Sequence, residues 1–179
     1  MFWLWMIFCL LFSCLLEVLL GFHRIVLPVL LSVIFYFACL LPWQRGILLY
    51  FVAAALLDSW FARTLPGNGL CLIGILLFAG LWRRFGNLNS LFSLLVPGIF
   101  IGLISGVMLN LNILSGQGRV SGTSLFFSCL YFFASMILLP AVWWLLEQGA
   151  RLLALRRHEV FSPTLRPEEY SVREEAVDE

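Results

Sequence analysis

The chain is dominated by six long apolar runs that short polar connectors separate. The runs cover residues 2–20, 25–43, 46–62, 69–82, 90–112 and 124–147. A helix needs about 20 apolar residues to cross the hydrocarbon core of a bilayer. Hydrophobic residues make up 62% of the sequence and charged residues only 12%, whereas soluble domains carry about 25% charged residues. A chain of 179 residues cannot hide so much apolar surface from water, which excludes a soluble globule, a secreted disulfide scaffold and a disordered chain.

The runs show no period-2 alternation, so helices are predicted to span the membrane in place of a closed barrel. The sequence therefore predicts an all-α, polytopic membrane protein, with a six-helix transmembrane bundle at residues 1–150 and a polar, acidic tail at 151–179. The fourth run, 69–82, is the shortest, and we expect either a short span or a re-entrant segment there. Residues 1–20 lack the positive n-region and cleavage site of a signal peptide, so we expect a retained first span.

All 11 basic residues are arginines, and their distribution predicts the orientation of the bundle. With six spans, the larger group shares the side of the N-terminus: Arg45, Arg83, Arg84, Arg151, Arg156 and Arg157. The opposite side carries Arg24, Arg63 and Arg119. Both termini are then expected in the cytoplasm. With five spans the N-terminus would lie outside and the tail would stay cytoplasmic. The sequence has no block of basic residues of the kind that indicates nucleic-acid binding.

Two carboxylates, Glu17 and Asp58, lie inside apolar runs, and ionisable groups at such depth are candidate functional groups. In the six-span arrangement both fall near the outer end of an outward-running helix. One interpretation is an outward-facing polar cluster, forming a shallow cavity or a partner-docking surface, with Arg24, Arg63, Asn110 and Asn112. In the other interpretation, each carboxylate reaches the interface or caps a neighbouring helix. The sequence leaves both open.

The residues offer little for catalysis. Asp58 opens the segment D-S-W-F-A-R, similar to the D-G-x-x-A-R start of the motif of membrane CDP-alcohol phosphotransferases, whose chemistry needs several aspartates around two metal ions. The next aspartate is Asp178, in the tail, so that metal site cannot be built. The five cysteines lie in apolar runs without a C-x-x-C pair, as small hydrophobes do. We expect no catalytic residue, metal ion or cofactor.

A stripe of small residues marks the fifth run. Gly98, Gly102 and Gly106 repeat every four residues, and Ser105 lies beside them. Small residues at this spacing form a flat helix surface that a second helix can approach closely. The stripe is therefore predicted to pack against another helix of the same bundle or to dock the single span of a partner protein.

One ordered pattern joins the third to fifth runs: Leu56-Leu57-Asp58, Pro66-Gly67, Gly69-Leu70, a short apolar run, Arg83-Arg84 and another span. Over residues 45–112 this order resembles the MreD family of rod shape-determining proteins. The resemblance places Asp58, Gly67, Gly69 and Arg83 at motif positions that are not catalytic. It implies a scaffold in the bacterial cytoplasmic (inner) membrane that connects MreB filaments and an MreC-like single-span partner with lateral-wall peptidoglycan synthases.

The fold of that family is also similar to the substrate-binding subunits of energy-coupling-factor transporters. This similarity implies an alternative function, the capture of a vitamin-like small molecule in an outward cavity with polar and aromatic lining. The level of Glu17 and Asp58 is the candidate position for such a cavity. A ligand retained through purification would favour transport, and copurification of a single-span, coiled-coil partner would favour the scaffold.

Overall fold

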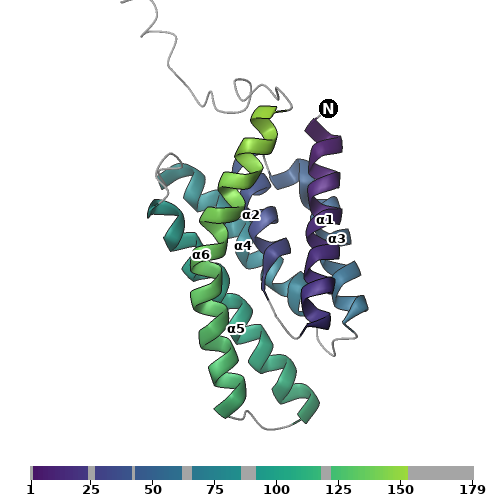
Figure 1. Ribbon diagram of the computed structural model, residues 1–179, viewed down its shortest axis with the longest axis vertical. Helices are drawn as coiled ribbons and strands as arrows, with labels where there is room; N and C mark the ends of the chain where they lie inside the picture. Colours follow the sequence, from purple (N-terminus) through teal and green to yellow (C-terminus); the bar gives the residue numbers. More distant parts are fainter. Residues whose placement is uncertain are drawn as a thin grey trace, which may run out of the picture.

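The computed structural model describes residues 2–23, 27–41, 43–61, 66–85, 92–117 and 122–152. Within these ranges the chain forms six α-helices and one 3-10 turn: α1 (Phe2–Phe22), α2 (Val29–Leu40), α3 (Trp43–Trp60), α4 (Gly67–Phe85), η1 (Phe92–Leu94), α5 (Leu95–Gln117) and α6 (Gly122–Leu152). The start of α1 and the end of α6 lie at the same end of one bundle (Figure 1). An all-α protein of six helices is thereby confirmed, whereas tail residues 153–179 lie outside the described residues.

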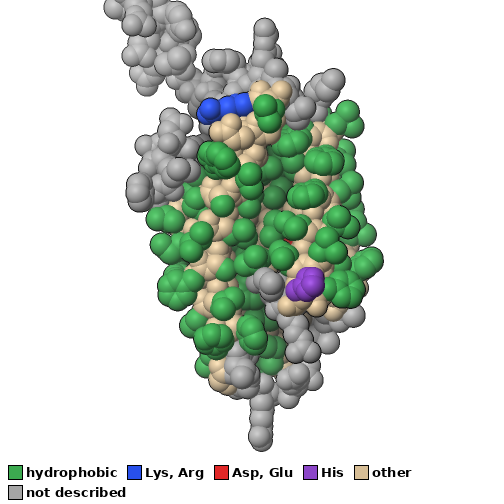
Figure 2. Space-filling view, in the orientation of Figure 1, with side chains coloured by type: hydrophobic (Ala, Val, Ile, Leu, Met, Phe, Trp, Pro, Cys, Tyr) green, Lys and Arg blue, Asp and Glu red, His purple; other side chains and the backbone are tan. Residues whose placement is uncertain are grey.

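The outer surface of the bundle is apolar. Helix α1, residues Leu95–Ser115 of α5 and residues Leu125–Leu152 of α6 are each long and apolar enough to cross a membrane. Hydrophobic side chains cover most of the face seen in Figure 2, with basic side chains near the end of α6 and a histidine towards the opposite end. Soluble monomers rarely expose apolar patches larger than a few hundred Å². The chain is therefore an integral membrane protein with several apolar helices.

Helix α2 is short and lies at the centre of the bundle. Its 12 residues extend for about 18 Å at 1.5 Å per residue, well below the roughly 30 Å of hydrocarbon in a bilayer. All residues of α2 are buried, and α2 contacts each of the other five helices. Prolines explain its length: Pro28 precedes the first residue, and Leu41, which stands before Pro42 in the sequence, is extended, as residues before proline tend to be.

The expectation that the fourth segment is the short one is wrong. Helix α4 is continuous over 19 residues, about 28 Å in length, and the short helix is α2. The difference arises because α4 continues past its apolar run at both ends. It begins with Gly67-Asn68-Gly69 and carries Arg83 and Arg84 in its last turn, whereas a count of apolar residues stops at such positions.

Aromatic side chains fill the core around α2. The rings of Phe35, Tyr36 and Phe37 are almost completely buried. Tyr36 meets Trp143 of α6 edge to face, with ring centroids 4.8 Å apart, and Phe37 meets Phe2 of α1 in the same manner at 6.0 Å. Edge-to-face pairs place the positive ring edge against the negative ring face. These contacts hold α2 against helices from both ends of the sequence.

Helices α5 and α6 pair closely along their length and extend beyond the other helices at the end of the bundle opposite the N-terminus (Figure 1). Helix α6 has 31 residues and contains Pro140. At the same end of the bundle α2 and α4 begin, so their first turns lie among polar side chains from α1, α3, α5 and α6. The candidate site lies at this level.

Candidate functional site

Glu17 caps the buried helix α2. Its side chain is 5% exposed, and its Oε2 accepts a hydrogen bond of 3.0 Å from the backbone N–H of Leu30. Leu30 is the second residue of α2, and the first N–H groups of a helix have no acceptor within the helix. The carboxylate also places negative charge at the positive end of the helix dipole. Glu17 of α1 therefore stabilises the start of its neighbour in the chain.

Asp58 caps α4 in the same way. Its carboxylate, with a side chain 8% exposed, accepts the backbone N–H of Asn68 at 3.1 Å on both oxygens. The N–H of Gly69 donates to Oδ2 at 3.1 Å. Two otherwise unsatisfied donors in the first turn of α4 thus share one acceptor group from α3. Helix capping, one of the two interpretations left open by the sequence, is the one that these contacts support.

The two caps reveal a weak repeat in the sequence. In each helical hairpin, a carboxylate near the end of the first helix binds the first turn of the second helix. The sequence of each hairpin places an acid, an arginine and a Leu-Pro pair in that order: Glu17, Arg24 and Leu27-Pro28, then Asp58, Arg63 and Leu65-Pro66. Sequence reasoning missed this repeat, although the order of the residues carries it. Arg24 and Arg63 lie outside the described residues.

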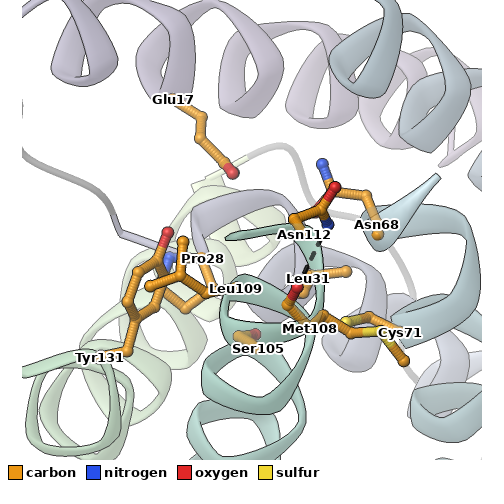
Figure 3. A pocket seen from close by; sticks show the side chains of 11 residues that line it. Glu17, Pro28, Leu31, Asn68, Cys71, Ser105, Met108, Leu109, Asn112 and Tyr131 are labelled. Atoms are coloured by element: carbon orange, nitrogen blue, oxygen red, sulfur yellow. Dashed lines mark hydrogen bonds between the residues drawn. The ribbon is translucent and has the colours of Figure 1, made fainter. Parts of the chain in front are cut away.

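A small polar cavity of about 40 Å³ lies where five helices converge, beside the caps (Figure 3). Its polar lining comes from α1, α4, α5 and α6: Glu17, Asn68, Cys71, Ser105, Asn112 and Tyr131. Pro28 and Leu31 close it on the side of α2. Of the cluster expected from sequence, Glu17 and Asn112 share this cavity, and Asp58 is connected to it through its hydrogen bond with Asn68. Asn68, Ser105 and Tyr131 also line the cavity and were not expected in the cluster.

Asn110 does not belong to the cavity, contrary to expectation. Its Nδ2 donates to the carbonyl of Gly106 at 2.9 Å and to Ser128 Oγ of α6 at 2.6 Å. Two positions along a helix differ in direction by roughly 200°, so Asn110 and Asn112 face different sides of α5. Asn110 therefore contributes a polar contact between α5 and α6 instead.

The glycine stripe of α5 packs against α6 of the same chain. A Cβ atom on Gly102 would lie 2.8 Å from Phe132 Cα, and one on Gly98 would lie 2.9 Å from the Ser135 carbonyl oxygen. At Gly106 the nearest atom would be Ser128 Cβ at 3.4 Å. The backbones approach too closely for any larger residue at the first two positions. Helix α6 thus occupies the surface that the sequence also assigned to a partner span.

Arg83 binds the far end of α2. Its Nη1 donates to the carbonyl oxygen of Leu41, the residue that follows α2, at 3.2 Å. Gly67 begins α4 and lines the cavity. A Cβ on Gly69 would lie 4.0 Å from Asp58 Oδ2. Of the four positions marked by the family resemblance, Gly67, Gly69 and Arg83 therefore lie at the two ends of α4, and Asp58 binds the first turn of α4 from α3.

Arg83→Ala is expected to lower the unfolding free energy modestly, by about 1–2 kcal/mol, because a charged donor to a helix-terminal carbonyl is lost. Arg84 follows it in the same turn, is exposed, and provides the matched control, for which we expect almost no change from Arg84→Ala. Thermal unfolding of both variants in the same detergent measures the difference. Equal effects for the two arginines would contradict a specific role for Arg83.

All five cysteines are free thiols. Those of Cys14 and Cys71 make weak hydrogen bonds to backbone carbonyls of Ala53 and Ile104 on neighbouring helices, each at 3.8 Å. Among the residues that the structure describes, no three His, Cys, Asp or Glu side chains are grouped to hold a metal ion. A larger hollow of about 280 Å³ lies between α1 and α3, and its lining is apolar: Leu11, Cys14, Leu15, Val18, Leu56, Leu57 and Trp60.

No protein-family model matches the chain, and neither the curated proteins nor the solved structures contain a match.

Proposed function

We propose that this chain is a non-catalytic membrane scaffold of the cell-elongation machinery. In this role it helps to maintain rod shape by linking MreB filaments and an MreC-like single-span partner to lateral-wall peptidoglycan synthesis. The single observation that carries the proposal is the helix-capping contact of Asp58, whose carboxylate accepts two backbone N–H groups from the first turn of α4. A buried carboxylate committed to holding two helices together supports a structural purpose for the motif positions.

The contacts of Arg83 support the same conclusion. Asp58 holds the start of α4 and Arg83 joins its last turn to the end of α2. The residues that carry the family resemblance thus define the position of α4 within the bundle. Such an arrangement suits a protein whose function is to present a fixed set of helices to partners.

The volume of the polar cavity argues against the transport alternative. Pockets for small molecules typically enclose about 300–1,000 Å³, whereas the cavity beside Glu17 encloses about 40 Å³. The larger hollow between α1 and α3 has an apolar lining, which does not match a polar, vitamin-like ligand. We therefore favour the scaffold over a substrate-binding subunit.

The proposal places the chain in the bacterial inner membrane with both ends of the described bundle in the cytoplasm. Arg83 and Arg84 lie in the last turn of α4 and Arg151 in the last turn of α6, and the N-terminus lies at the same end as the end of α6 (Figure 1). The positive-inside rule assigns such an end to the cytoplasm. The tail would then meet the side on which MreB filaments assemble.

Purification from the native host in a mild detergent, with an affinity tag after Glu179, tests the proposal. We expect an MreC-like single-span protein and peptidoglycan synthases of the elongation machinery to copurify. Depletion of the chain is expected to turn rod-shaped cells round, and re-expression is expected to restore the rods. Mass spectrometry and light microscopy provide the two measurements.

The control is a tagged version of an unrelated multi-pass protein of the same membrane, which should copurify with none of these partners. Unchanged cell shape after depletion, together with recovery of a bound small molecule or of energising transporter subunits, would refute the scaffold and support the alternative.

A further inference from the structure

Ser105 lines the polar cavity and carries a buried hydroxyl. Its side chain is 9% exposed, and its Oγ forms no hydrogen bond with any part of the chain that the structure describes. Figure 3 shows Ser105 on α5 at the wall of the cavity, below Glu17 and beside Met108. A hydroxyl buried without a hydrogen-bond partner is costly. A molecule in the cavity that binds the Ser105 hydroxyl would remove this cost.

The volume of the cavity restricts what that partner can be. A buried water needs about 10–15 Å³ of such space and two to four polar neighbours, and the cavity encloses about 40 Å³. Glu17, Asn112 and Tyr131 place further polar groups around the same space. An organic ligand does not fit, whereas a few water molecules do.

We propose that the cavity is a hydration site that holds a cluster of about three ordered waters, which bind the Ser105 hydroxyl and the polar groups around it. The cluster would join α5, through Ser105, to the carboxylate of α1 that caps α2 and to the phenol of α6. Water would thus mediate the polar contact between the first helices of the chain and the α5–α6 pair. This inference does not depend on the proposed scaffold function.

Two methionines make the proposal directly testable. Met108 lines the cavity, whereas Met6 is fully buried in the apolar core. We expect a nuclear Overhauser effect between water and the ¹³C-labelled ε-methyl of Met108 in the full chain in lipid nanodiscs, and none at Met6. The absence of a water contact at Met108 would overturn the proposal.

Ser105→Ala gives a second measurement whose sign separates a wet cavity from a dry one. If waters bind the hydroxyl, its removal leaves them one partner short, and the Tm in detergent should fall by about 2–4 °C. If the cavity is dry, removal of an unpaired buried hydroxyl should raise the Tm. An unchanged or raised Tm would overturn the proposal.

Ser135→Ala is the matched control for loss of a hydroxyl in the same pair of helices. Ser135 is fully buried on α6, but its hydroxyl donates to the Tyr131 carbonyl of its own helix. This variant shows the effect of deleting a serine hydroxyl that does not face the cavity. We expect Met108 to keep its water contact in Ser135→Ala and to lose intensity at least twofold in Ser105→Ala.

Discussion

Replacement of Asp58 with alanine is expected to destabilise the folded protein by about 2–6 kcal/mol, because one buried and one half-buried backbone N–H group lose their acceptor and each unpaired donor costs about 1–3 kcal/mol. The donors are those of Asn68 and Gly69 in the first turn of α4. Because folded domains are stable by only about 5–15 kcal/mol, we expect a large loss of monodisperse protein. Size-exclusion profiles and thermal unfolding in one detergent measure the effect.

Asp58→Asn separates helix capping from a requirement for negative charge. Its side-chain oxygen can still accept an N–H, and asparagine oxygen atoms cap helices about as well as those of aspartate. We therefore expect Asp58→Asn to recover much of the stability that Asp58→Ala loses. If the two variants are equally unstable, the charge of Asp58 matters in its own right and capping is not its main role.

Gly102→Leu is expected to prevent α5 from packing against α6. The Cβ atom alone would lie 2.8 Å from Phe132 Cα and 3.2 Å from the Phe132 carbonyl oxygen. Both are backbone atoms of a helix, so relief requires the two helices to separate. We expect a destabilisation of about 3 kcal/mol, the upper end of the usual cost of overpacking, observed as the loss of a folded peak in size-exclusion chromatography and of a cooperative thermal transition.

Gly80→Leu provides the matched control for this substitution. Among the residues that the structure describes, no atom outside the neighbouring backbone of α4 lies within 4 Å of a Cβ on Gly80. The same leucine should therefore be accommodated there, and the loss of a helical glycine should favour α4 slightly. If Gly102→Leu folds as well as Gly80→Leu, α5 and α6 do not pack through the glycine stripe. The stripe would then be open to a partner span, as its sequence also allowed.

The number and order of the helices could be predicted from the apolar runs, but their lengths could not. Hydropathy reports which residues tolerate lipid, and all residues of α2 do, although α2 is enclosed by protein. The prolines at positions 28 and 42 carried the information about its length. For α4 the missing information was tertiary, because its polar first turn depends on the carboxylate of Asp58.

The two acids of the site, Glu17 and Asp58, could also be identified from the sequence, because a carboxylate in an apolar run is costly and marks a candidate functional position. Their acceptor role required knowledge of which helix begins beside each of them: Glu17 binds Leu30, and Asp58 binds Asn68. The sequence pattern placed Ser105 in the glycine stripe as a packing residue, whereas the structure places it in the wall of the cavity. A hydroxyl gives no sequence signal that distinguishes a packing position from a polar one.

The burial of α2 has a consequence for how the chain enters the membrane. A segment of 12 helical residues is too short to be released into lipid as an independent span, and none of its side chains faces lipid in the finished bundle. Its first turn also depends on Glu17 of the preceding helix. We therefore expect α1 and α2 to enter the membrane together as a hairpin, around which the later helices close.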